Sequence, residues 1–178
     1  MPRDSLTKTA EYPHPPERVW VALTDARALA EWLMPNTFGR AEVGHRFEFR
    51  YDPMPMCGAG ITECEVLEVD PPRRMLWSWR NVNTPGKRQP PTMTVEWTLE
   101  PATVRGEPGT RLTLVQRGLK GQLPFHGLMM SMGWSRFLKR MIPGVLPHVN
   151  DDGSYTPGAI PLDKRCYKAR TIPDEFVR

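Results

Sequence analysis

Residues 65–79 read EVLEVDPPRRMLWSW, and this stretch predicts two β-strands joined by a turn. The first strand lies within residues 61–69, where the alternation of apolar and polar side chains is imperfect, so we expect a bulge or burial of both faces. The prolines fall in the turn, where they remove no ladder hydrogen bond. In the second strand the period of two directs Met75, Trp77 and Trp79 to one face. The stretch therefore predicts a hairpin whose buried face is aromatic.

The same period of two continues on both sides of this hairpin. Residues 46–51 alternate aromatic and charged side chains. Residues 92–100, and less cleanly residues 110–117, direct apolar side chains to one face. Residues 6–12 are a candidate first strand. Because strands that follow one another through short turns form an antiparallel meander, we expect one antiparallel sheet with a buried face.

Helical spacing marks three further segments. A short helix is expected directly after Pro15 and Pro16, and Asp25 is placed to cap a second one over residues 26–33. Residues 126–142 form a long amphipathic pattern that ends at a Pro-Gly pair. This terminal helix is the large apolar surface left to cover the sheet. The predicted fold class is therefore α+β, with a curved antiparallel β-sheet wrapped around a long C-terminal helix and two short helices after the first strand.

One domain is expected over residues 1–148. The 178 residues, 39% of them hydrophobic and 25% charged, are typical of a single globular core and exclude a wholly disordered chain. Residues 149–178 lack periodicity and begin with a polar, Gly-containing run. They predict an extended or mobile C-terminal tail.

Composition also restricts the partners and the compartment. The net charge of +4 is spread over scattered basic pairs, so no nucleic-acid partner is expected. The apolar runs are too short to cross a bilayer and the first residues lack a secretory signal, so we expect no membrane insertion and a cytoplasmic location. The three cysteines are odd in number and lack CxxC spacing, which favours reduced thiols. Exposed apolar area on the short helices would allow a homodimer.

The sequence shows no catalytic or metal-binding motif. The four histidines lie on different expected elements without metal-ligand spacing, and they are His14, His45, His126 and His148. No phosphate loop, dinucleotide fingerprint or nucleophile motif is present, so we expect neither a metal nor a cofactor. His126 opens the long helix, where a histidine is most simply a solvated residue. An inward-pointing Glu68 at the strand irregularity would pair with an arginine such as Arg80 and serve the structure.

Three local patterns, in this order, resemble a known superfamily. They are residues 16–25 followed by Trp32 and Leu33, the hairpin of residues 65–79, and residues 133–138 of the last helix. Together they resemble the START-like helix-grip superfamily (SRPBCC), and within it the bacterial branch similar to the domain that activates the Hsp90 ATPase. This superfamily hosts lipid carriers, hormone receptors, polyketide cyclases and a co-chaperone domain, so the resemblance predicts the fold more sharply than the function.

The resemblance implies a long cavity between the sheet and the terminal helix that holds a hydrophobic small molecule, such as a lipid, a sterol or a polyketide-like compound. The inward side chains suit such a ligand because they are rich in aromatic rings and methionine. The candidate ligand-binding residues are Phe47, Phe49, Trp77, Trp79, Trp97, Met130, Trp134 and Phe137. The alternative is that these side chains fill a solid core, as inward strand residues do by default.

Three functions remain open from the sequence. Non-enzymatic binding of a hydrophobic small molecule predicts an apolar cavity with few polar groups, and this is the favoured hypothesis. A polyketide cyclase or hydrolase predicts convergent ionisable groups with shifted pKa values inside the cavity. A co-chaperone partner of an Hsp90-type ATPase rests on the resemblance alone. It is the least favoured, because the chain shows no additional N-terminal domain of the kind that the eukaryotic activator carries.

Overall fold

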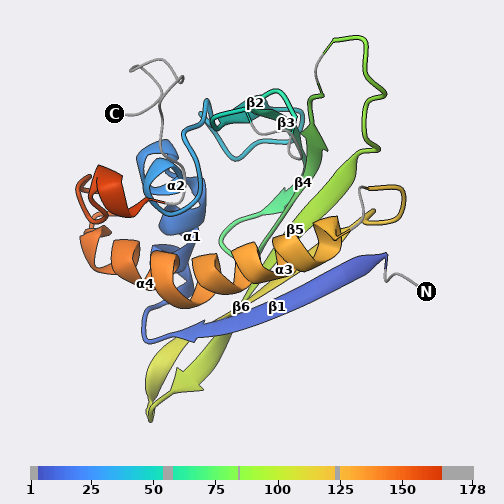
Figure 1. The fold of residues 1–178 in the computed structure, drawn as a ribbon. Helices are drawn as coiled ribbons and strands as arrows, with labels where there is room; N and C mark the ends of the chain where they lie inside the picture. The colour runs from blue at the N-terminus through green and yellow to red at the C-terminus, as the bar shows by residue number, and fades with distance from the viewer. Residues whose placement is uncertain (1–3, 54–57, 84, 123–124, 166–178) are drawn as a thin grey trace.

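The computed structural model describes residues 4–53, 58–83, 85–122 and 125–165, and Figure 1 shows the fold. Its six strands form one sheet and are β1 (Ser5–Tyr12), β2 (Arg46–Arg50), β3 (Ile61–Asp70), β4 (Arg74–Asn81), β5 (Met93–Val104) and β6 (Glu107–Arg117). Their order across the sheet is β1-β6-β5-β4-β3-β2, and every neighbouring pair is antiparallel. The predicted antiparallel sheet is confirmed, with β1 added at the edge beside β6.

Alternation sorts the side chains of the sheet into an inner apolar face and an outer polar face. In β4 the predicted residues Met75, Trp77 and Trp79 are all buried. The pairing of β3 with β4 shifts register between Val66 and Glu68, so the irregularity expected in β3 is a β-bulge.

The bulge places Glu68 on the outer face of the sheet. In a regular strand Glu68 would share the inner face of the buried Val66, but the additional residue reverses the alternation. The Glu68 side chain is 55% exposed and pairs with Arg74. Arg80 pairs with Glu63 instead. The expectation of an inward-pointing Glu68 paired with Arg80 is therefore wrong.

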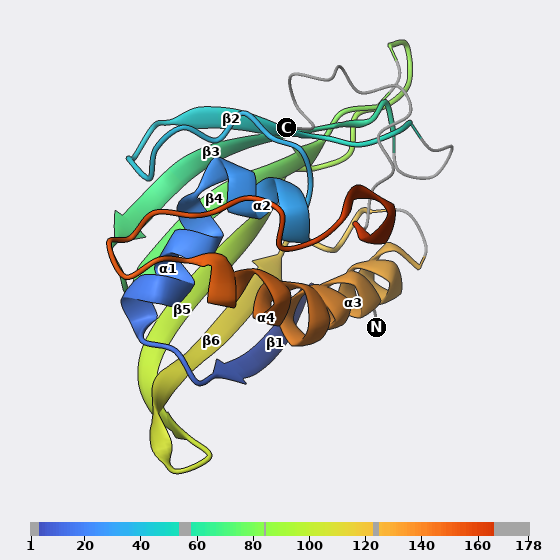
Figure 2. The same cartoon turned by 90° about the vertical axis from the view of Figure 1, so that its left-hand side faces the viewer.

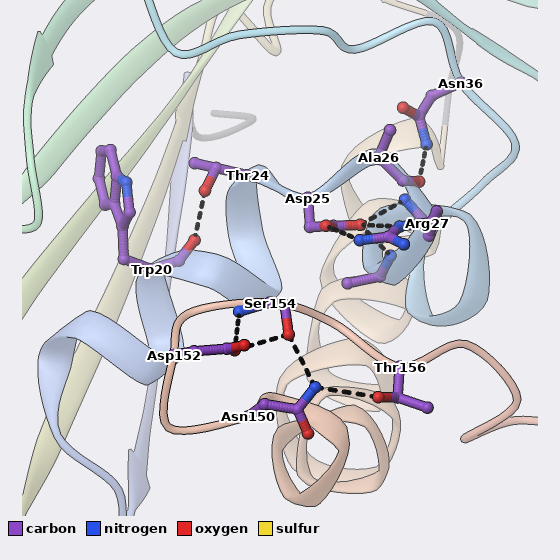
Figure 3. Close-up of polar contacts among 11 residues, drawn as sticks. Trp20, Thr24, Asp25, Ala26, Arg27, Asn36, Asn150, Asp152, Ser154 and Thr156 are labelled. Atoms are coloured by element: carbon purple, nitrogen blue, oxygen red, sulfur yellow. Dashed lines mark hydrogen bonds and ion pairs between the residues drawn. The ribbon is translucent and has the colours of Figure 1, made fainter.

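Two short helices follow β1, as predicted, and they are α1 (Pro16–Thr24) and α2 (Ala26–Trp32). Asp25 lies between them and caps α2, since its carboxylate accepts the N–H groups of Arg27 at 2.8 Å and Ala28 at 3.3 Å. Figure 3 shows this cap and the Arg27 guanidinium that pairs with the same carboxylate. Burial raises the pKa of Asp25, but these hydrogen bonds outweigh it and hold the pKa below its usual value.

The terminal helix crosses the inner face of the sheet, as Figure 1 shows. It is not one continuous α-helix: α3 (His126–Arg136) is followed by a π-helical segment η1 (Phe137–Met141), by α4 (Ile142–Val145) and by a 3-10 turn η2 (Leu146–His148). The apolar face predicted for this helix is buried at Trp134, Phe137, Leu138 and Met141. The helix thus covers the sheet as expected.

Pro143 accounts for an unusual contact at the end of the π-helical segment. The N–H of Ile142 bonds to the carbonyl of Phe137, and Pro143 has no N–H to offer the carbonyl of Leu138. The hydroxyl of Tyr12 in β1 donates to this Leu138 carbonyl instead, at 2.7 Å. Burial also raises the pKa of Tyr12, so the hydroxyl keeps its proton. A strand residue therefore completes the hydrogen bonding of the helix and joins it to the edge of the sheet.

Residues 149–165, here called the strap, pack on the domain. Figure 2 shows this segment running back across α1 and α2 after α4. Val149, Tyr155 and Ile160 are buried. The tail was predicted to be extended or mobile, and the strap is mostly without regular secondary structure and packs on the domain. The domain boundary at residue 148 stays a prediction. The remaining part of the predicted tail, residues 166–178, lies outside the described residues.

Glu31 of α2 holds the far part of the strap. Its side chain is 2% exposed, and its carboxylate accepts the N–H groups of Gly158 at 2.6 Å and Ile160 at 2.7 Å. The guanidinium of Arg165 lies 3.6 Å from the same carboxylate. Burial and the nearby Glu31 charge raise the pKa of Tyr155. A buried charge is costly unless it is paired, and these donors supply the pairing.

A polar turn holds the near part of the strap, and Figure 3 shows it. The Asn150 side-chain amide donates to the hydroxyls of Ser154 at 2.8 Å and Thr156 at 3.0 Å. The Asp152 carboxylate accepts the backbone N–H of Ser154 at 2.8 Å. The Gly and Asp residues that suggested a mobile tail therefore form a closed turn.

Candidate functional site

An apolar cavity of about 150 Å³ lies between the sheet and α3. Strands β3 and β4, the residues after α2, and the helical segments α3 and η1 form its wall. The lining residues are Leu33, Met34, Tyr51, Thr62, Trp79, Asn81, His126, Met129, Met130, Gly133, Trp134 and Phe137. Most of them are aliphatic or aromatic, so the space suits the apolar part of a ligand.

Half of the eight residues predicted to bind a ligand border this cavity. They are Trp79, Met130, Trp134 and Phe137. They come from β4, α3 and η1, the sheet and helix surfaces between which the sequence placed the cavity. Their role in binding remains a prediction, but the structure brings them together around one space.

The other four predicted residues lie in the solid core. Trp77 and Trp97 are fully buried, with ring centroids 5.9 Å apart and planes at 86°. Phe49 lies 6.0 Å from Trp77, and Phe47 lies 5.3 Å from it, both in edge contact. Rings from α2 and from the segment after it pack on these residues: Trp32 lies 5.9 Å from Trp97, and Phe38 lies 6.3 Å from Trp77 and 4.8 Å from Phe47.

Hydrogen bonds fix the two indole rings of the cavity wall. Trp79 and Trp134 lie 5.7 Å apart with their planes at 70°. The Trp79 indole N–H donates to Asn81 Oδ1 at 3.1 Å. The Trp134 indole N–H donates to Gln116 Oε1 at 2.7 Å, and Gln116 is fully buried. Moving either ring into the cavity would leave a buried N–H without its acceptor, which is unfavourable.

His126 is the unexpected member of the wall. The sequence suggested a solvated histidine at the start of the helix, but the side chain of His126 is buried, with 6% of the residue exposed. The preceding Phe125 adopts a left-handed conformation with φ of 68° and is 78% exposed instead. The chain therefore buries the polar ring and exposes the apolar one, which hydrophobicity alone could not predict.

The Nε2 atom of His126 is buried without a hydrogen-bond partner among the described residues. Burial lowers the pKa of this histidine below its usual value, because a charged imidazolium would lose its hydration. The ring is therefore neutral at pH 7. It adds one polar atom to an otherwise largely apolar wall.

Other wall residues were missed by the sequence analysis for different reasons. Thr62 was detectable, since the period of two places it on the inner face of β3 with Val66, and both are fully buried. Leu33 and Met34 follow the end of α2, where no periodic pattern applies. Gly133 has no side chain, so it adds nothing to the apolar pattern from which inward-facing positions of a helix are predicted.

A larger hollow of about 620 Å³ lies on the outer face of the sheet, over β2, β3 and β4. Its charged side chains are paired with one another, for example Arg46 with Glu65 at 3.0 Å and Arg80 with Glu63. Cys64 also borders it, but burial and the neighbouring Glu63 raise the pKa of this thiol, so it stays protonated and unreactive. We place the candidate site at the smaller inner cavity, because its wall is apolar and contains an unpaired polar atom.

Metal binding and membrane spanning find no support in the part of the chain that the structure describes. There, no three side chains among His, Cys, Asp and Glu lie close enough together to hold a metal ion. Over the same residues, no helix combines the length and apolarity that crossing a membrane requires.

Comparison with known proteins agrees with this architecture. The model of the family described as Activator of Hsp90 ATPase homolog 1-like protein matches residues 13–144. Among solved structures, protein MLL2253 from Mesorhizobium loti is 29% identical, with a TM-score of 0.64 over 78% of this chain and 93% of that one. A comparison with curated proteins gives no match.

Two further solved structures share the fold. DynU16, a protein in the dynemicin biosynthetic locus, is 25% identical with a TM-score of 0.62, over 79% of this chain and 46% of its own. The Aha1 dimer from Colwellia psychrerythraea is 20% identical with a TM-score of 0.56, over 75% of this chain and 90% of that one. The family and these neighbours fit a ligand-binding domain of the helix-grip type.

Proposed function

Because this chain belongs to the Activator of Hsp90 ATPase homolog 1-like family, we propose that it binds a hydrophobic small molecule in the cavity between the sheet and α3 and leaves that molecule chemically unchanged. The observation that carries this proposal is a partly open, mainly apolar cavity whose two indole walls are fixed by hydrogen bonds. A preformed apolar cavity with few polar groups is typical of small-molecule binding sites.

The composition of the cavity wall supports binding over catalysis. A cyclase or hydrolase needs an acid and a base held together at the substrate. Among the described wall residues there is no Asp, Glu, Lys or Arg, and the titratable side chains are His126 and Tyr51. We therefore rank an enzyme that uses this cavity second. A co-chaperone role ranks third, because its support comes from the family name and not from the cavity.

The compartment and the assembly belong to the same proposal. The buried thiol of Cys64 is unpaired, which favours a reducing compartment such as the cytoplasm. A homodimer is an additional proposal, since the similar protein from Colwellia psychrerythraea is a dimer. From the sequence, we expected the apolar surface for dimer formation on the two short helices. Among the described residues, however, α1 and α2 carry no large exposed apolar side chain, whereas α3 carries Leu128 and Met132. Light scattering measures the assembly directly.

Gly133 offers a direct test of binding in the cavity. It lies in α3 at the cavity wall, and a Cβ added there would approach no atom more closely than Phe137 Cε2, at 3.8 Å. The substitution Gly133→Leu therefore extends an apolar side chain into the space without a backbone clash. We expect it to abolish the binding of apolar probes, measured by quenching of tryptophan fluorescence and by native mass spectrometry.

Gly133→Ala is the matched control, because it makes the same change in helix propensity and fills little of the cavity. It should bind the probes as the natural chain does. Equal binding to the Gly133→Leu variant would show that the probes bind elsewhere and would refute the proposed site. An unliganded mass throughout, together with capture of an Hsp90-type ATPase, would favour the partner-protein function.

A further inference from the structure

His126 Nε2 is one of four buried side-chain atoms without a partner among the described residues. The others are the indole nitrogens of Trp77 and Trp97 and the hydroxyl of Tyr155. The two indoles lie in the solid aromatic core, and Tyr155 lies in the strap. His126 alone among these four residues borders the cavity.

Several neighbouring polar atoms of the wall are paired within the protein. Asn81 Oδ1 accepts both the Trp79 indole N–H at 3.1 Å and the Thr62 hydroxyl at 2.8 Å. The Trp134 indole donates to Gln116 at 2.7 Å. The wall of the cavity is thus largely apolar and includes His126, whose Nε2 has no partner among the described residues.

We propose that the cavity selects a neutral, mainly apolar molecule that carries a hydroxyl group, and that this hydroxyl pairs with His126 Nε2. This inference rests on the proposed function and names its ligand class. A hydroxyl both donates and accepts, so it satisfies Nε2 in either tautomer of the neutral ring. Leaving Nε2 unpaired beside a purely apolar ligand keeps the full penalty of its burial.

The same wall disfavours an anionic ligand. A carboxylate placed beside His126 would be buried without a cationic partner, since no Lys or Arg is among the described wall residues. Burial of an unpaired charge is strongly unfavourable, and the neutral imidazole supplies no compensating charge. The site therefore favours an alcohol or a phenol over a fatty acid whose carboxylate points inward.

The size of the cavity limits the enclosed part of the ligand. A cavity of about 150 Å³ is the size that accepts one benzene ring in an engineered protein core. One hydroxylated ring, or a short hydroxylated chain, fits this space. The remaining part of a larger ligand would extend out of the cavity past Met129, which borders the cavity and is 40% exposed.

Phenol and toluene form a matched pair of probes, since they differ by a hydroxyl in place of a methyl group. We expect His126→Leu to lower the ratio of phenol to toluene affinity by about fivefold to tenfold, the size of one hydrogen bond. The wall control Met130→Leu, which removes no hydrogen-bonding group, should leave the ratio unchanged. Ligand-induced shifts in unfolding temperature give both affinities. The ¹⁵N chemical shift of His126 Nε2 should move with phenol and not with toluene.

Each outcome separates the two proposals. A ratio that His126→Leu leaves unchanged, with an unmoved Nε2 resonance, overturns the hydroxyl assignment while binding in the cavity stands. Binding of octanoate in preference to octanol, sensitive to Gly133→Leu, likewise overturns the neutral ligand class. If neither phenol nor toluene binds the natural chain, the proposed function fails, and this inference fails with it.

Discussion

Replacement of Glu31 by glutamine should destabilise the protein, because this carboxylate joins the strap to α2. The residue is almost fully buried and accepts two short backbone hydrogen bonds, from Gly158 and Ile160, beside the Arg165 guanidinium. Glutamine keeps one carbonyl oxygen, so one of the two N–H groups would face the side-chain NH₂ instead of an acceptor.

The magnitude follows from the contacts that change. A hydrogen bond to a charged acceptor contributes about 1.5–3 kcal/mol, so loss of one bond and weakening of the second should lower the free energy of unfolding by about 2–4 kcal/mol. Urea denaturation followed by tryptophan fluorescence measures this value. Glu17→Gln on α1 is the matched control, because Glu17 is exposed and its change should stay within about 0.5 kcal/mol.

Hydrogen exchange tests whether the strap itself carries the effect. In Glu31→Gln the amides of Gly158 and Ile160 should exchange faster, because their acceptor is weakened. In a chain that ends at residue 156 the same substitution should cost little, since both donors are gone. A Glu31→Gln variant as stable as the natural chain, with unchanged protection at both amides, would refute the assignment of Glu31 as the anchor of the strap.

Three further changes test other parts of the structure. Tyr12→Phe should lower the free energy of unfolding by about 1–3 kcal/mol in urea denaturation, because it leaves the buried Leu138 carbonyl without a donor; an unchanged stability would contradict the role given to Tyr12. Trp79→Ala should cost clearly less than Trp97→Ala, for which about 3–5 kcal/mol is expected, because Trp79 already faces a cavity; equal costs would show that the cavity is filled. As the pH falls below about 6.5, the unfolded chain protonates His126 while the folded chain, with its lowered pKa, does not, so stability should fall by up to about 1.4 kcal/mol per pH unit. His126→Leu should flatten this dependence, whereas His14, whose pKa is lowered by burial and by Arg18, contributes equally to both proteins.

The sheet and its helical cover were predictable because each carries a repeated signal. A period of two marked the inner face of β4, and the spacing of Trp134, Phe137 and Met141 marked the buried side of the terminal helix. Such signals arise from many side chains, so a single irregular position does not hide them. The bulge at Glu68 was visible as an imperfect alternation, but its effect on the direction of one side chain was not.

The cavity and the strap were less predictable because single contacts decide them. Trp77 and Trp79 lie on the same strand face two residues apart, and the sequence cannot show that Phe38 and Trp97 pack on the first while the second borders open space. The strap has no periodic pattern of apolar side chains that would have predicted its packing. It is held by hydrogen bonds to Glu31, a residue more than one hundred positions away in the sequence. A glutamate in a short helix can be recognised as buried, and therefore as an anchor for another segment, only when the position of that helix in the fold is known.

The walls of the cavity are held in place by hydrogen bonds within the wall and behind it, and this explains how an aromatic core keeps an open space. Asn81 and Gln116 fix the indoles of Trp79 and Trp134, and the Tyr12 hydroxyl holds the π-helical segment that begins at Phe137. Collapse onto the cavity would gain apolar contacts but would break buried hydrogen bonds, and each group left unsatisfied costs about 1–3 kcal/mol, against about 0.8 kcal/mol gained for each buried methylene. The open state is therefore built into the fold, and it is available to a ligand without prior rearrangement.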